Sequence, residues 1–163
     1  MTFRAPAAKG SSPQKTAGHL LTGQRGEELA AEYLRGLGLE VLDRNWRPAG
    51  TASALEIDLV ALGKDLLLFV EVKTRTHKPG TAFTPQDSFT PAKGRKLLRA
   101  ASLYLEERGQ WRQPCRFDLI CVSLPLAGPE GPGPTLEHFK NVLSFQSAGR
   151  RTAAGLHAPW QPW

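Results

Sequence analysis

Acidic and basic side chains interrupt two of the most apolar segments of this chain. Glu56 and Asp58 lie in the first segment, and Glu71 and Lys73 lie in the second, with Glu71 thirteen residues after Asp58. Ionised side chains are costly to bury unless they are paired or bind a metal. Hard divalent cations prefer carboxylate oxygens, and a lysine beside such a cation offsets charge on a phosphate. These residue types therefore point to metal-assisted phosphodiester chemistry.

The spacing predicts that the two segments are antiparallel strands, Leu55–Leu62 and Leu66–Thr74, joined by the short turn Gly63-Lys64-Asp65. Side chains alternate along a strand. Glu56 and Asp58 should therefore share one face of the first strand, with Ile57 and Leu59 on the other.

By the same alternation, Glu71 and Lys73 should share a face of the second strand, opposite Val70 and Val72. The continuous apolar run before Glu71 predicts a central strand that is covered on both faces.

Ordinary ion pairing is the alternative explanation for these charges. Glu71 or Asp58 could be neutralised by Lys73 or Arg75, since strand ends often carry solvated charges. Such pairing accounts for one acid and one base, but it accounts poorly for three acids beside one lysine.

A further acid, Glu27, lies in the segment predicted to form the first helix. On a helical wheel it is close to Ala30, Ala31 and Leu34, the side expected to face the sheet, whereas Glu28 lies on the polar side. Glu27 is therefore the better candidate to approach the acidic strands. The alternative is that both glutamates are simply favourable residues in the first turn of a helix.

Seven basic residues surround the second strand and the start of the next helix. They are Lys73, Arg75, Lys78, Lys93, Arg95, Lys96 and Arg99, and Asp87 is the sole acid between residues 74 and 105. Cations at a helix N-terminus oppose the helix dipole unless a phosphate lies nearby. A charged run is usually a solvated face, but beside a carboxylate cluster this one predicts a track for a polyanion. Lys93, Arg75, Arg95, Lys96 and Lys78 are the predicted nucleic-acid contacts.

The elements that must position these residues follow an alternating pattern. The pattern predicts helices over Gln24–Leu37 and from Pro91 to about Arg108, with Thr90 as the N-cap of the second. Further strands are predicted over Glu40–Arg47 and Arg116–Leu124, and a weaker last element over Thr135–Val142. The order α-β-β-β-α-β predicts an α/β fold in which helices flank a mixed central sheet.

Composition indicates one domain with two tails. The 163 residues are 40% hydrophobic and 22% charged, as in ordinary globular proteins. Residues 1–18 and 146–163 have no apolar periodicity and are predicted to be disordered, leaving a single domain over 19–145. The tails hold five of the 21 basic residues and none of the 15 acidic ones, so the net charge of +6 comes mostly from them.

Neither a membrane span nor a secretory signal is apparent, so a cytoplasmic location and no membrane partner are expected. Cys115 and Cys121 lie six residues apart in one predicted strand. At about 20 Å they are too far apart to form a disulfide, and reduced thiols are expected.

The residues together resemble the YraN family of small bacterial proteins, which look like Holliday-junction resolvases with a restriction-endonuclease-like fold. The resemblance covers roughly residues 22–143. It rests on Gly23-x-x-Gly26-Glu27, the Ala31–Leu34 helix, Arg44-Asn45-Trp46-Arg47, Glu56-Ile57-Asp58-Leu59, Phe69-Val70-Glu71-Val72-Lys73-x-Arg75, Pro91-x-Lys93 and Arg116-Phe117-Asp118. Asp58 and Glu71-Val72-Lys73 also fit the arrangement of nucleases of the PD-(D/E)xK class.

The resemblance implies a nuclease-like site of Glu27, Asp58, Glu71 and Lys73, with Glu56 as a supporting acid and Lys93 directed to the same region. Two positions depart from the family pattern: Gly94 stands where glutamine is frequent, and Leu55 stands where a glycine usually precedes Glu-Ile-Asp. Neither departure removes a predicted metal ligand.

The leading functional hypothesis is an endonuclease that hydrolyses DNA phosphodiester bonds, in branched or otherwise structured DNA. Asp58 and Glu71 would bind Mg²⁺ (or Mn²⁺), Glu27 would assist, and Lys73 would position the attacking water. Resolvase-like chemistry on two strands would favour a homodimer. The alternatives are a non-catalytic nucleic-acid-binding protein and a protein-interaction module whose contact is the tail bearing Trp160 and Trp163.

Overall fold

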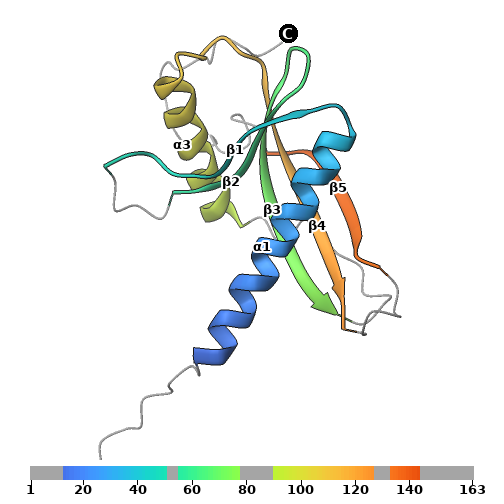
Figure 1. Ribbon diagram of the computed structural model, residues 1–163. Helices are drawn as coiled ribbons and strands as arrows, with labels where there is room; N and C mark the ends of the chain where they lie inside the picture. Colours follow the sequence, from blue (N-terminus) through green and yellow to red (C-terminus); the bar gives the residue numbers. More distant parts are fainter. Residues whose placement is uncertain (1–12, 51–54, 78–89, 127–132, 144–163) are drawn as a thin grey trace, which may run out of the picture.

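A five-stranded mixed sheet with strand order β1-β2-β3-β4-β5 forms the centre of the molecule (Figure 1). The computed structural model describes residues 13–50, 55–77, 90–126 and 133–143. The elements are α1 (Pro13–Gly36), β1 (Glu40–Trp46), β2 (Ile57–Leu62), β3 (Leu67–His77), α3 (Pro91–Glu107), β4 (Cys115–Pro125) and β5 (Thr135–Leu143). The predicted α/β class and the α-β-β-β-α-β order are confirmed, and β5 completes the sheet.

The strand pairings explain why the sheet is mixed. β1, β2 and β3 form an antiparallel meander, β3 and β4 are parallel, and β5 returns antiparallel to β4. Parallel neighbours need a long crossover connection, which here contains α3. The two acid-bearing strands β2 and β3 are therefore adjacent, and the first turn of the helix that follows β3 contacts the middle of that strand, where Lys93 meets Glu71.

The two helices cover opposite faces of the sheet (Figure 1). On the α1 side, Leu68 and Val70 of β3 pack with Ala30, Ala31 and Leu34 of the helix. On the α3 side, Leu67 and Phe69 belong to a second core. The prediction that this strand is central and covered on both faces is confirmed.

Tyr104 organises the core on the α3 side. Its ring is fully buried and makes edge-to-face contacts with Trp46 and Phe69, with centroids 5.1 and 5.6 Å apart. The start of α3 is fixed as predicted, because Thr90 is the N-cap, its side chain accepts a hydrogen bond from the Lys93 amide, and Pro91 opens the helix.

The predicted start of the first helix is wrong. α1 begins at Pro13 rather than Gln24, so residues 13–18 are helical and not part of a disordered tail. This first part of α1 projects away from the sheet (Figure 1), and Leu20 and Leu21 are 63% and 67% exposed. At Leu20 and Leu21 the helix thus carries exposed rather than core side chains, so the apolar pattern that locates a helix begins only farther along. Residues 1–12 and 146–163 lie outside the described residues.

A buried ionic cluster fixes β5 to β4. Asp118 is fully buried, and its carboxylate accepts hydrogen bonds from Arg116, from the backbone amide of Asn141 and from His138 at 2.8–2.9 Å. Burial alone would raise the pKa of Asp118, but these hydrogen bonds outweigh it and hold the pKa below its ordinary value. The last element is thus more firmly held than its weak pattern suggested.

The two cysteines lie in β4 as predicted, and both are free. Burial raises the pKa of each thiol to about 12, so both are protonated and weakly nucleophilic at neutral pH. Within the described part of the chain, neither helix combines the length and the apolar character that crossing a membrane requires.

Candidate functional site

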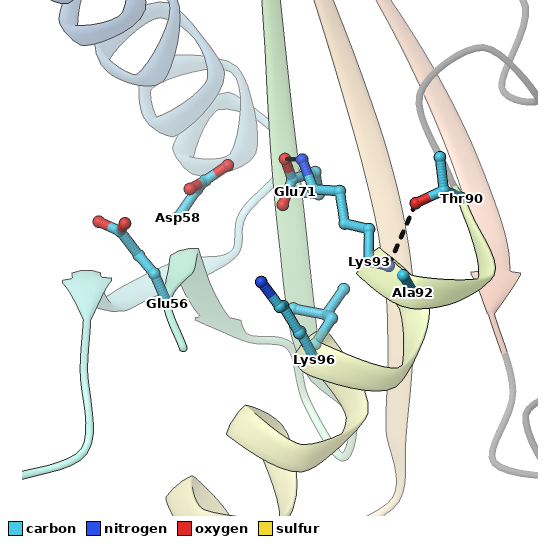
Figure 2. Close-up of a pocket in the computed structure, with 8 residues that line it drawn as sticks. Glu56, Asp58, Glu71, Thr90, Ala92, Lys93 and Lys96 are labelled. Carbon is cyan, nitrogen blue, oxygen red and sulfur yellow. Dashed lines mark hydrogen bonds and ion pairs between the residues drawn. The ribbon is translucent and has the colours of Figure 1, made fainter. Parts of the chain in front are cut away.

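Asp58 and Glu71 open into one cleft between the sheet and the first turns of α3 (Figure 2). The cleft has a volume of about 390 Å³. Its lining residues are Glu56, Asp58, Glu71, Thr90, Ala92, Lys93, Lys96 and Leu97. Neighbouring strands thus supply the acids, and the N-terminal part of one helix supplies two lysines.

The backbone places Asp58 where β2 and β3 separate. Their ladder extends from Leu62↔Leu67 to Leu59↔Val70 and does not continue to the next pair. Beyond it, the Val72 amide donates a hydrogen bond to Asp58 Oδ2 at 2.7 Å. The carboxylate therefore takes the place of a ladder carbonyl and is fixed at the end of the strand.

The predicted alternation around Asp58 is wrong in one respect. Ile57 and Leu59 were expected on one face, but Ile57 packs in the core on the α3 side and Leu59 in the core on the α1 side. The regular two-residue period is therefore interrupted at Asp58 itself. The interruption lets Asp58 interact both with groups in the cleft and with Glu27 of α1.

Negative charge on Asp58 is poorly compensated. Burial raises the pKa of Asp58 to about 7, and the carboxylates of Glu71 and Glu27 add to the increase. The hydrogen bond from the Val72 amide and the charge of Lys93 oppose it. A divalent cation in the cleft would supply the missing positive charge.

Glu71 is paired with Lys93, the lysine that the family resemblance directs to this region, rather than with a lysine or arginine of its own strand. Its side chain is 9% exposed, and Lys93 Nζ donates a hydrogen bond to its Oε1. The alternative explanation by ion pairing named Lys73 or Arg75 as partners of Glu71, and the structure gives this role to Lys93 instead. The first turn of α3 lies against the middle of β3, and this packing brings together residues 22 positions apart in the sequence.

Glu27 approaches the site from α1 without lining the cleft. Its Oε2 accepts a hydrogen bond from Asn45 Nδ2 at 2.9 Å, and its charge contributes to the raised pKa of Asp58. Gly26 permits this approach, because a Cβ at that position would lie 1.8 Å from Thr74 Oγ1 on β3. Glu28 instead faces solvent and pairs with Arg25, as the helical wheel indicated.

Lys73 and Arg75 continue the face of β3 that carries Glu71. Lys73 is level with Cys121 of the adjacent strand β4, and neither Lys73 nor Arg75 is among the residues that line the cleft. The lysines that do line the cleft are Lys93 and Lys96. The cation next to the carboxylates is thus contributed by α3.

The other predicted residues have different surroundings. Glu56 lines the cleft and pairs with Arg47 at 2.9 Å. Figure 2 shows the amino group of Lys96 directed toward the side of the cleft that holds Glu56 and Asp58. Arg95 is exposed on α3, and Lys78 lies outside the described residues.

The acids fit an open metal site rather than a closed cage. Within the ranges that the structure describes, no three His, Cys, Asp or Glu side chains converge closely enough to hold a metal ion. Asp58 and Glu71 supply two carboxylates to one cleft, and Mg²⁺ is commonly bound through one or two carboxylates with waters and substrate phosphate completing its shell. The poorly compensated charge of Asp58 supports the same fit.

Two residues that the sequence did not predict as part of the site hold acidic side chains there. Asn45 and Arg47 hold Glu27 and Glu56, respectively, through their side chains. Both belong to the Arg44-Asn45-Trp46-Arg47 segment that carried part of the family resemblance. The signal in the sequence that could have indicated their role was a pair of polar residues on either side of Trp46 in a predicted strand.

Comparison with known proteins identifies the family. The model of the uncharacterised protein family UPF0102 matches residues 26–122, which include both acidic strands and the start of α3. The chain belongs to this family. The resemblance to the YraN family, which is the same family, is thereby confirmed.

Relatives in UPF0102 match most of the chain. A UPF0102 protein of Oleidesulfovibrio alaskensis is 37% identical over 95% of this chain and 70% of its own length. One from Lawsonia intracellularis is 38% identical over 86% of this chain and 96% of its own length. A UPF0102 protein of Pseudomonas putida is 42% identical over 74% of this chain and 91% of its own length. The similarity therefore includes the cleft.

Proposed function

We propose that this UPF0102 protein is a metal-dependent endonuclease that hydrolyses phosphodiester bonds in DNA. The observation that carries the proposal is the shared cleft: Asp58 and Glu71, from adjacent strands, face the lysine-bearing N-terminal turns of α3. Buried carboxylates beside a helix N-terminus suit the joint binding of a cation and a phosphate.

Asp58 and Glu71 would hold Mg²⁺ or Mn²⁺ from the protein side. When bound, such a cation polarises a phosphoryl oxygen and lowers the pKa of a coordinated water. The Val72 amide keeps Asp58 oriented toward the cleft, and Glu27 contributes negative charge from the α1 side. Lys73, two residues beyond Glu71 on the same face of β3, would position the attacking water and stabilise charge on the phosphate.

The basic residues around the cleft would hold the DNA backbone. Lys96 lines the cleft, Arg95 is exposed on the same helix, and Arg75 extends the same face of β3. The Thr90-capped start of α3 adds the positive end of a helix dipole. Because these contacts involve phosphates rather than bases, binding should be insensitive to sequence and should weaken steeply with salt.

A non-catalytic nucleic-acid-binding protein is the second candidate. The observation that favours it is the Lys93–Glu71 ion pair, which already neutralises one of the two cleft carboxylates. In that case the cleft would bind a phosphate through its lysines, and a metal would not be needed.

Cleavage assays distinguish the two. Purified protein is incubated with branched, single-stranded and linear duplex DNA in Mg²⁺, in Mn²⁺ and in EDTA. We expect metal-dependent cleavage that D58N, E71Q and K73A each reduce to background while salt-dependent DNA binding remains. E32Q, which changes an exposed acid on α1, is the matched control.

Two results would contradict the catalytic proposal. Cleavage that is unaffected by EDTA would exclude the metal, and equal cleavage by wild type and D58N would exclude the site. DNA binding without salt dependence would in addition exclude the second candidate.

A further inference from the structure

Asn45 has an unusual backbone for a strand residue. Its φ is +49°, in the left-handed region that L-residues other than asparagine, aspartate and histidine seldom occupy. Asp43, two residues earlier, accepts a hydrogen bond from Tyr104 of α3 at 2.6 Å, and the ring of Trp46 also packs on Tyr104.

This backbone reverses the faces of β1. In a regular strand Asp43 and Asn45 would share one face and Trp46 would lie on the other. Here Asp43 and Trp46 both contact α3, whereas the side chain of Asn45 reaches Glu27 of α1. The left-handed residue thus turns one amide to the opposite side of the sheet.

The reversal occurs beside the corresponding interruption in β2. Trp46 is paired with Ile57 and Arg44 with Leu59, so Asn45 lies level with Asp58. The alternation of side chains between the two faces of the sheet is therefore interrupted at paired positions of β1 and β2. The Asn45 amide and the Asp58 carboxylate both interact with Glu27, one by a 2.9 Å hydrogen bond and the other electrostatically.

We infer that Asn45 is a positioning residue for the acidic cleft, and that its left-handed backbone aims its amide at Glu27 and holds that carboxylate beside Asp58. The inference rests on the proposed metal-dependent function. The close packing of Gly26 on Thr74 sets the distance between α1 and the sheet. The amide of Asn45 then fixes the direction of the Glu27 side chain, which would otherwise rotate toward solvent.

Glycine substitution separates the side chain from the backbone. Glycine accepts a positive φ without strain, so N45G removes the side-chain amide of Asn45 and keeps the left-handed backbone at this position. The chain offers a matched control, because Asn141 has a φ of +55° and bonds Asp118 through its backbone amide, which glycine also has. N141G therefore makes the same substitution in a similar backbone, in a strand that does not line the cleft.

The measurement is Mn²⁺ affinity by titration calorimetry, with urea unfolding of each variant in metal-free buffer. We expect N45G to weaken Mn²⁺ binding about tenfold or more, as loss of a supporting contact to a metal site typically does. N141G should stay within about twofold of wild type, and both variants should unfold alike. In an E27A background, N45G should have no additional effect, because Asn45 acts through Glu27.

Several outcomes would overturn the inference. Equal Mn²⁺ affinity for N45G and N141G would exclude a positioning role. Weaker binding accompanied by a much larger loss of stability in N45G than in N141G would make the contact structural. An undiminished N45G effect in the E27A background would show that Asn45 does not act through Glu27. A wild-type protein that binds no Mn²⁺ is a separate result, because it refutes the proposed metal dependence before any variant is compared.

Discussion

Replacing Lys93 by methionine should destabilise the metal-free protein and strengthen its response to metal. Methionine keeps the apolar stem of the side chain but removes its charge. Glu71, which is 9% exposed, would then be left without its partner beside Asp58. Breaking a fully buried ion pair costs about 3–5 kcal/mol. Because Lys93 is 34% exposed, solvent screens the pair and we expect a loss of about 1–2 kcal/mol.

The assay is urea unfolding followed by circular dichroism, with and without saturating Mg²⁺. Lys93 competes with a cation for Glu71, so Mg²⁺ should stabilise K93M more than wild type, by about the same 1–2 kcal/mol. The control is K96M, one turn farther along α3, where the lysine is exposed. It should change stability by no more than about 0.5 kcal/mol.

Two results would refute this reasoning. If K93M and K96M are equally stable in metal-free buffer, the ion pair does not compensate the charge of Glu71. If Mg²⁺ stabilises K93M and wild type equally, Lys93 and the cation do not share a site.

Three further predictions follow from packing and burial. G26A should lose about 1–3 kcal/mol in urea unfolding because its Cβ would collide with Thr74, whereas G23A, with no atom within 4 Å, should gain about 0.5–1 kcal/mol; equal effects would contradict this packing. Since the folded pKa of Asp118 is lowered, its carboxylate stabilises the fold fully above about pH 4 and loses this effect as the pH falls. D118N should therefore be less stable at pH 7 and less acid-dependent below about pH 4, and an unchanged acid profile would count against the cluster. Both thiols of β4, Cys121 buried and Cys115 half-buried, should react with iodoacetamide at pH 8 much faster in urea than in the native protein, and equal rates would contradict their raised pKa values.

Local patterns predicted much of the fold. The turn Gly63-Lys64-Asp65 between two apolar segments indicated the hairpin, and Thr90-Pro91 marked the start of α3, because turn and capping chemistry depend on a few adjacent residues. Apolar periodicity located the part of α1 that packs on the sheet. It missed the start of the helix at Pro13, since Leu20 and Leu21, which precede the packed part, are exposed rather than in the core.

The sequence by itself determined which side chains are available for chemistry, and it placed Asp58 and Glu71 on neighbouring strands. Tertiary structure decided which of them meet. Glu71 is paired with Lys93 across 22 residues, and Glu27 is held by Asn45 across 18, through contacts between a helix and a strand. Strand periodicity assumes regular backbone, so it could not foresee the left-handed Asn45 or the interruption at Asp58. Those two irregularities lie at paired positions of β1 and β2, in a sheet that packs against α1 on one face and α3 on the other. They bring Asp58 within reach of groups on both faces.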